Sequence, residues 1–202
     1  MINPHRCLVL LACLAAVAAS AQTFQLIKAD RAPKIDGKLS EEIWQQPPVI
    51  RKFFTLGVGG LPVPEKCVVW LAADSDALYV AVNCKEESMS ERILKYRKKD
   101  EPVWQDDGIE IFLDPARSKD SYAQIIVSSA GVIMDGYCQS KAYGSLDVSW
   151  DSGAVAAVQT GPEGWTMEVR IPFAQLPVSD PQADWGIHIA RNQRGRNSEH
   201  LT

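Results

Sequence analysis

Apolar and polar residues alternate in short runs along most of the chain, and a period of two predicts β-strands. The clearest runs are 67–73 and 78–84, which flank a turn-forming Asp-Ser-Asp-Ala tetrapeptide at 74–77. When the chain is folded about that turn, one face of the hairpin is apolar along its whole length. The same register places Cys67 opposite Cys84. We therefore predict a β-hairpin whose apolar face lies against a core.

A second hairpin is predicted about the turn at 161–164, between strands at 154–159 and 165–171. Glu168 lies on the face of the second strand that is expected to be solvated. Pro172 ends this strand, because proline cannot donate to a hydrogen-bond ladder. Further strands are expected at 107–113, 122–128, 132–136 and 185–192, with a shorter pair at 24–27 and 52–55.

Turn-forming residues separate these strands about every 8–12 residues, which is typical of all-β domains. We therefore predict an all-β fold, an antiparallel β-sandwich or barrel. The polar segment 88–98 is expected to be a solvated connection with a single helical turn. The segment 191–202 is polar and carries no closing apolar strand, so we expect a loose tail or a chain truncated at its C-terminus.

The first 21 residues have the pattern of a secretory signal peptide. Arg6 precedes an apolar stretch at 7–19, which is too short to span a bilayer, and small residues at 19–21 fit a cleavage site. The alternative, lipid attachment at Cys13, would leave an apolar run after the modified residue. We expect residues 22–202 to be an exported domain, periplasmic or extracellular, that is not inserted in a membrane.

Charge and cysteine content narrow the candidate partners. The chain carries a formal net charge of −4 and has no basic stripe, which argues against nucleic acid and anionic membranes as partners. Cys67, Cys84 and Cys138 remain after signal cleavage. Cys67 and Cys84 form either a cross-strand disulfide or a pair of buried thiols, and Cys138 stays free in both cases. The absence of a Cys-x-x-Cys motif and the small number of histidines leave no candidate zinc site.

Several segments, taken in order, resemble family 9 carbohydrate-binding modules and their DOMON-like relatives. They extend from about Ile35 to Asn192, and they are 35–44 (IDGKLSEEIW), 70–82, 104–114 (WQDDGIEIFLD), 123–124, 164–173 and 185–189. The resemblance implies a jelly-roll-like sandwich that binds mono- or oligosaccharides, often at chain ends, and frequently lies beside a glycoside hydrolase. It implies a non-catalytic binding module.

The same resemblance implies a sugar site. Trp104 matches the first of two stacking tryptophans, Glu110 matches an acid that binds hydroxyl groups, and Asn192 lies near a binding-site asparagine. Strand alternation also turns Glu110 outward, away from the core. Gln124 is a further candidate, although the sequence does not decide whether it lies on the same side of the sheet as Glu110.

Two departures from the family pattern favour a structural or docking module as the alternative. Characterised binders have an arginine further along the strand that contains Gln124, at the position where this chain has Ile126. The second stacking tryptophan of the family lies beyond the position that corresponds to Thr202.

Four other tryptophans occupy motif or strand positions that favour structural roles: Trp44, Trp70, Trp165 and Trp185. Trp150 lies in a loop and is a weaker candidate for binding than Trp104. No cofactor is expected. The acidic turns at Asp74/Asp76 and Asp106/Asp107 offer carboxylates to a structural calcium ion, whose site the sequence does not fix.

Two further functions are weighed against sugar binding. Catalysis is disfavoured because no carboxylate pair lies in a hydrolase-like motif and no Ser-His-Asp or Cys-His set is present. A haem-binding electron-transfer domain, as in some DOMON relatives, would need Met134 or Met167 with His188 as axial ligands. Met167 falls on a buried strand face and is typical of a core residue.

Overall fold

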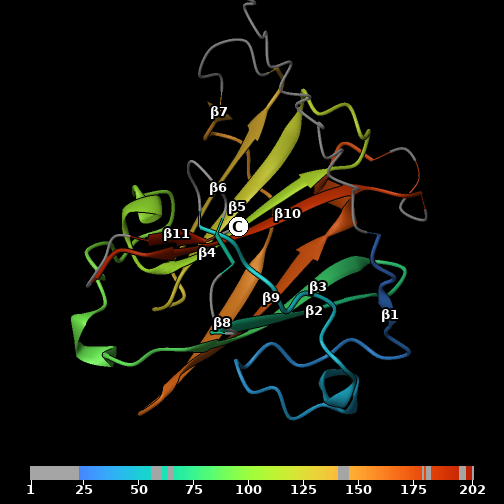
Figure 1. The fold of residues 1–202 in the computed structure, drawn as a ribbon. Coiled ribbons are helices and arrows are strands. Elements are labelled where there is room, and N and C mark those ends of the chain that lie inside the picture. The colour runs from blue at the N-terminus through green and yellow to red at the C-terminus, as the bar shows by residue number, and fades with distance from the viewer. Residues whose placement is uncertain are drawn as a thin grey trace, which may run out of the picture.

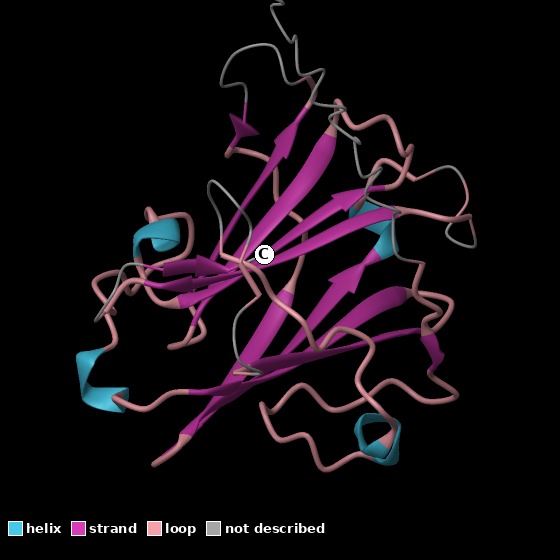
Figure 2. Cartoon of the chain, viewed as in Figure 1, coloured by secondary structure: helices cyan, strands magenta, loops and turns pink. Residues whose placement is uncertain are grey.

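The computed structural model describes residues 23–55, 61–62, 66–140, 146–178, 180, 183–195 and 199–201. These residues form two β-sheets packed face to face, with short 3-10 turns in the connections (Figures 1 and 2). The predicted all-β sandwich is confirmed. Residues 1–21, where a signal peptide is predicted, lie outside the described residues.

The first sheet has five strands in the order β1 (Ile27–Lys28), β2 (Cys67–Ala73), β3 (Ala77–Lys85), β9 (Gly164–Pro172) and β8 (Val155–Gly161). The second has six, in the order β11 (Glu199–Leu201), β10 (Gly186–Gln193), β4 (Gly108–Asp114), β5 (Tyr122–Ser128), β6 (Ile133–Cys138) and β7 (Leu146–Asp147). The 3-10 turns are η1 (Glu42–Gln45), η2 (Met89–Glu91), η3 (Val103–Gln105) and η4 (Phe173–Gln175). All strand pairs are antiparallel except β1 with β2, which is parallel.

The core between the sheets consists of the inward-facing alternate residues of both layers. On β2 and β3 these begin with Cys67 opposite Cys84 and continue with Val69 opposite Val82, which confirms the predicted register. On β4 the inward set is Ile109, Ile111 and Leu113, all fully buried. Because the period is two, Glu110 and Phe112 lie on the opposite side of the sheet.

The outer face of the five-stranded sheet is covered by the N-terminal segment, which contains β1 and η1 (Figure 1). Trp44 packs there against Trp70 and Tyr79 in a second apolar cluster. Glu168 is fully buried under this segment and accepts hydrogen bonds from Trp44 Nε1 and from the Asp36 and Gly37 amides. The prediction that the face carrying Glu168 is solvated is therefore wrong, because a distant segment folds over it.

Three local predictions need correction. Residues 52–55 form no strand; Phe54 makes an isolated bridge to Pro62 instead. Of the strand expected at 24–27, only Ile27 is in a strand, the two-residue β1. The tail from Arg191 is not structureless, because β10 continues to Gln193 and β11 pairs with it. Backbone hydrogen bonds to the neighbouring strand hold this polar segment, which has no alternation of apolar residues that would reveal a strand in the sequence. The single turn expected within 88–98 is confirmed as η2.

Candidate functional site

Trp104 projects from η3, just before β4. Val103 is buried beneath it, whereas the Trp104 side chain is 46% exposed, the highest fraction of the six tryptophans. The turn is fixed on its C-terminal side by Asp106, whose buried carboxylate accepts the Lys95 and Tyr96 amides at 2.8 and 3.1 Å. A buried valine and an anchored carboxylate therefore present the indole to solvent.

Glu110, Gln124 and Asn192 form one hydrogen-bonded cluster, referred to below as the polar trio. Gln124 Nε2 donates to Glu110 Oε2 at 2.9 Å, and Asn192 Nδ2 donates to Glu110 Oε1 at 2.6 Å. Gln124 on β5 lies directly opposite Phe112 on β4, so the two side chains share one side of the sheet. Glu110 lies two residues before Phe112 on β4 and therefore points to that side as well, which is the outer face of the six-stranded sheet. The structure thus answers the open question of whether Gln124 shares the side of Glu110.

The polar trio lies beside the residue that carries the exposed indole. Asn192 Nδ2, which donates to Glu110, also lies 3.4 Å from the Trp104 carbonyl oxygen. The Trp104 backbone therefore meets the side-chain cluster of the other three predicted sugar-binding residues, although the four come from four separate elements. Since each oxygen of the Glu110 carboxylate accepts an amide donor, the cluster is ordered before any ligand arrives.

Arg194 belongs to the same cluster and was not predicted. Its Nη2 donates to the Trp104 carbonyl at 3.1 Å and to Asn192 Oδ1 at 3.3 Å. Ile126 lies directly opposite Glu110 on β5 and is 2% exposed; its aliphatic side chain supplies no hydrogen-bond donor. Arg194 therefore brings a guanidinium to a site that lacks one at position 126. Its position in a polar tail without a periodic pattern gave no signal in the sequence.

Aromatic residues continue this outer face along β4. Phe112 lies 5.7 Å, centroid to centroid, from both Tyr122 on β5 and His188 on β10, with interplanar angles of 63° and 54°. Phe112 and Tyr122 are half-buried, and His188 is exposed.

Trp44, Trp70 and Trp165 are buried, which confirms their structural roles. Trp185 packs edge-on against Phe173 with ring centroids 5.5 Å apart. Trp150 packs on Tyr137 at the side of the main core, so the weaker candidate does not join the polar trio.

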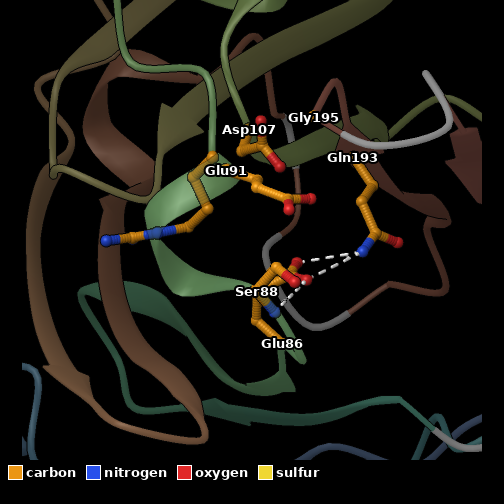
Figure 3. A pocket seen from close by; sticks show the side chains of 7 residues that line it. Glu86, Ser88, Glu91, Asp107, Gln193 and Gly195 are labelled. Atoms are coloured by element: carbon orange, nitrogen blue, oxygen red, sulfur yellow. Dashed lines mark hydrogen bonds between the residues drawn. The ribbon is translucent and has the colours of Figure 1, made fainter.

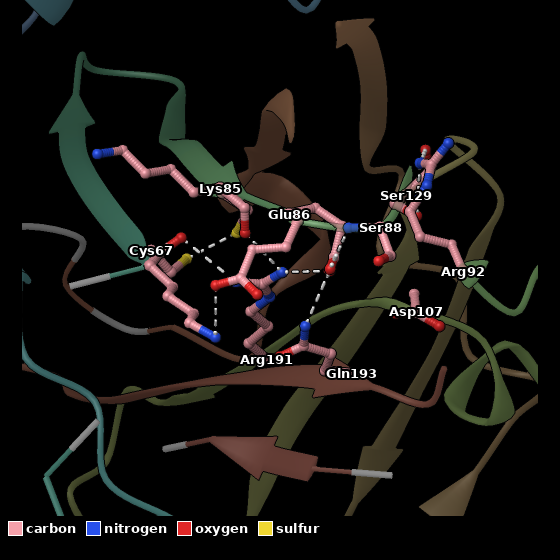
Figure 4. A network of polar contacts seen from close by, with 12 residues as sticks. Cys67, Lys85, Glu86, Ser88, Arg92, Asp107, Ser129, Arg191 and Gln193 are labelled. Atoms are coloured by element: carbon pink, nitrogen blue, oxygen red, sulfur yellow. Dashed lines mark hydrogen bonds and ion pairs between the residues drawn. The ribbon is translucent and has the colours of Figure 1, made fainter. Parts of the chain in front are cut away.

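The interior side of β10 carries an ion pair, next to the outward-facing Asn192. Arg191 is 1% exposed; its Nη2 lies 2.9 Å from Glu86 Oε2, and the guanidinium lies 5.9 Å from the centre of the Trp165 ring (Figure 4). The same guanidinium donates to the carbonyls of Lys66 and Lys85, which adjoin the two cysteines. Adjacent residues of one strand thus support the core and the candidate site.

The cysteine pair borders this ion pair. The Cys67 and Cys84 sulfur atoms lie 2.8 Å apart, and the structure holds both as free thiols. Burial, followed by the interaction with Cys84, raises the pKa of Cys67 well above its usual value. Cys138, also a free thiol, donates to the Ser140 carbonyl elsewhere in the molecule.

A small hollow opens beside Glu86 and is bordered by acidic residues (Figure 3). Gln193 donates to both oxygens of Glu86, and Asp107 accepts the Ile93 amide. Burial raises the pKa of Asp107 above the usual range. These carboxylates are thus engaged by the protein's own donors.

The two acidic turns considered for calcium use their carboxylates in the same way. Asp74 Oδ1 accepts the Asp76 and Ala77 amides, and Asp106 holds the 95–96 backbone. Among the described residues, no group of three His, Cys, Asp or Glu side chains is arranged to hold a metal ion.

The haem alternative does not fit the geometry. Met167 is fully buried between the sheets, which confirms it as a core residue. Met134 and His188 lie on β6 and β10, three strand spacings or about 14 Å apart across the sheet, too far to bind one iron from its two sides. In the part of the chain that the structure describes, no helix is long and apolar enough to cross a membrane.

Comparison with solved structures supports the fold. A family 9 carbohydrate-binding module from Caldicellulosiruptor kristjanssonii in complex with cellotriose has a TM-score of 0.56 and 17% identity, covering 87% of this chain and 79% of the other. A structure of such a module from the same organism with glucose has a TM-score of 0.57 and 18% identity, covering 88% and 84%. A Bacteroides uniformis protein has a TM-score of 0.66 and 13% identity, covering 87% and 86%.

No curated protein matches the sequence. A family model described as "Carbohydrate family 9 binding domain-like" matches residues 35–200, which include both the N-terminal motif over Glu168 and the polar trio. The chain belongs to this carbohydrate family 9 binding-domain-like family.

Proposed function

We propose that the outer face of the six-stranded sheet binds a mono- or oligosaccharide, without catalysis, at Trp104 and the polar trio. The observation that carries this proposal is the hydrogen-bond chain joining the exposed Trp104 segment through Asn192 to Glu110. It joins the backbone of the residue that carries the exposed indole to ordered acceptors and donors, of which Glu110 and Asn192 are 6% and 1% exposed.

The chemistry of this face matches that of a sugar ring. The C–H side of a pyranose packs on an indole, and its hydroxyls need partners that both donate and accept. An ionised carboxylate accepts about four hydrogen bonds, so Glu110 keeps acceptor capacity beyond its bonds to Gln124 and Asn192. Arg194 adds a donor at the rim and compensates for Ile126.

The relatives indicate the first ligands to test, because the two Caldicellulosiruptor kristjanssonii structures hold cellotriose and glucose. We also propose that the domain is exported after removal of residues 1–21, whose pattern is that of a signal peptide. In that compartment it would assist polysaccharide breakdown by holding the substrate of a partner glycoside hydrolase.

Isothermal titration of the purified protein with glucose and cellotriose tests the proposal. We expect Trp104→Ala to weaken binding about tenfold or more, as for an aromatic anchor, and Glu110→Gln to weaken it as well. Val155→Ala, on exposed β8 of the other sheet, is the control and should leave affinity unchanged.

Two results would contradict the proposal. Unchanged affinity in Trp104→Ala would show that the sugar lies elsewhere. No binding of any sugar, including on a glycan array, would favour a docking module, the function that the aliphatic Ile126 favours.

A further inference from the structure

Cys67 and Cys84 face each other across β2 and β3 in the arrangement that a disulfide needs. The Lys85 amide donates to the Lys66 carbonyl at 2.7 Å, so these two neighbours of the cysteines form a hydrogen-bonded pair. Hydrogen-bonded and non-hydrogen-bonded pairs alternate along antiparallel strands, so Cys67 and Cys84 form a non-hydrogen-bonded pair. The Cα atoms of such a pair are about 4.5 Å apart, within the range of disulfides. With the sulfur atoms 2.8 Å apart, a bond can close without movement of the backbone.

In the folded chain this cysteine pair is closed off from solvent. The two side chains are 3% and 0% exposed and belong to the core between the sheets. Arg191 reaches them from the other sheet, and its guanidinium donates to the carbonyls of Lys66 and Lys85, the residues next to the cysteines (Figure 4). Glu86 holds this guanidinium by an ion pair at 2.9 Å. An oxidant of protein size therefore cannot reach either sulfur once β10 has packed against the five-stranded sheet.

Burial also suppresses the reactive form of the thiols. A thiolate, and not a thiol, attacks a disulfide oxidant. Burial, followed by the interaction with Cys84, raises the pKa of Cys67 well above its usual value, although Arg191 lowers it. The folded dithiol should therefore react slowly at neutral pH, whereas the open chain exposes ordinary thiols.

The hairpin that aligns the two cysteines is local, whereas the residue that covers them is distant in sequence. Cys67 and Cys84 are 17 positions apart and are joined by the turn between β2 and β3. Arg191 follows Lys85 by 106 positions. Contacts between residues close in sequence cost less loop-closure entropy and form earlier in folding. The cysteines can therefore lie opposite each other, and still be accessible, before β10 covers them.

We propose that Cys67 and Cys84 form a structural disulfide that is made while the sandwich is still open and is sealed when β10 brings Arg191 over it. One cysteine thiolate attacks a disulfide oxidant, and the second cysteine then displaces the mixed disulfide. The two cysteines lose two protons and two electrons, and the oxidant leaves as two thiols. The proposed export supplies such an oxidant, and the inference does not depend on sugar binding.

The first test follows oxidation of the reduced full-length protein by oxidised glutathione, in buffer and in urea up to the midpoint of unfolding. Samples are quenched with acid, unfolded, alkylated and cut with trypsin. No lysine or arginine lies between Lys66 and Lys85, so both cysteines fall in one peptide, 67–85, apart from the other cysteines. A disulfide makes this peptide two hydrogens lighter and leaves it without alkyl groups. We expect it to form roughly a hundredfold or more faster at the midpoint than in buffer, where open molecules are rare.

The second test is thermal unfolding of the oxidised protein and of protein refolded in reductant. The oxidised form should unfold at a temperature roughly 5–10 °C higher, since the bond closes a loop of 17 positions. Cys84→Ser should lose this shift. Cys138→Ser is the matched control, because it removes another buried cysteine, and it should keep the shift.

Each part of the proposal has its own contrary result. Equal oxidation rates in buffer and at the midpoint would show that the folded pair is accessible and would overturn the sealing by Arg191. A peptide 67–85 that carries two alkyl groups under all conditions would overturn the disulfide and show a pair of buried thiols. A shift in unfolding temperature that persists in Cys84→Ser would assign the effect to other cysteines.

Discussion

Replacing Glu168 by glutamine would test how the N-terminal segment is held on the five-stranded sheet. Trp44 Nε1 donates to Oε1 at 2.8 Å, whereas the Gly37 and Asp36 amides donate to Oε2 at 2.8 and 3.0 Å. Glutamine offers one oxygen and one NH2 group. In its better orientation the oxygen keeps both backbone donors, and the NH2 group faces the indole N–H, which is left buried without an acceptor.

The expected loss is about 1.5–3 kcal/mol in the free energy of unfolding, the cost of one hydrogen bond to a charged group. Urea denaturation at neutral pH measures it, with an unchanged m-value as the sign that the native fold persists. Trp44→Phe removes the same bond, so the double variant should cost less than the sum of the two single changes. A loss below about 0.5 kcal/mol, or strict additivity, would refute this reasoning.

The pH dependence of the same variant gives a second measurement. Burial raises the pKa of Glu168 above its usual 4.5, although the Trp44, Asp36 and Gly37 donors oppose this. The folded chain then binds this proton more tightly than the unfolded chain, so the contribution of Glu168 to stability falls as pH rises between the two pKa values. The stability difference between wild type and variant should therefore be largest below about pH 4.5 and shrink above it. A difference that grows with pH would show that the N–H donors outweigh burial.

Three further predictions concern a glycine with positive φ, the buried ion pair and the cysteine pair. Gly37→Ala should lower the free energy of unfolding by about 1–3 kcal/mol, because φ is +80° and an added Cβ would lie 2.7 Å from a backbone carbon. Gly131→Ala is the matched control, since its φ is +83° but the nearest contact of an added Cβ is at 3.9 Å. An equal loss of stability in the two variants would contradict the steric explanation. Arg191→Met should lower the free energy of unfolding by about 3–5 kcal/mol, since it leaves the buried Glu86 carboxylate without its cationic partner, and a neutral effect in thermal denaturation would contradict this. Under a disulfide oxidant, Cys67 and Cys84 should form a bond visible as the loss of two thiol hydrogens in mass spectrometry of the unreduced protein; the same mass change in Cys84→Ser would rule out that pairing.

The hairpin of β2 and β3 was predictable because its apolar alternation is compatible with a single register, and a shift by one residue would expose the core face. The outward direction of Glu110 followed from the same rule. Its proximity to Gln124 and Asn192 did not, since it depends on pairing of β4 with β5 and β10, which no local pattern encodes.

Other features were missed for related physical reasons. The two-residue β7 is too short to show a period, and Arg194 lies in a polar segment without one. Glu168 was assigned to a solvated face because alternation describes one sheet alone and cannot show that residues 35–44, over a hundred positions away, fold over it. The family resemblance located Trp104, whereas only the coordinates show how buried Val103 and anchored Asp106 present it.

The opposite placement of the N-terminal segment and the polar trio has a practical consequence for attachment. Residues 27–44 lie over the five-stranded sheet, on the layer opposite the polar trio (Figure 1), so a label on a side chain exposed there, such as Lys28 with 86% of its side chain exposed, would leave the outer face of the six-stranded sheet uncovered. Immobilisation for glycan screening should therefore use a side chain within residues 27–44.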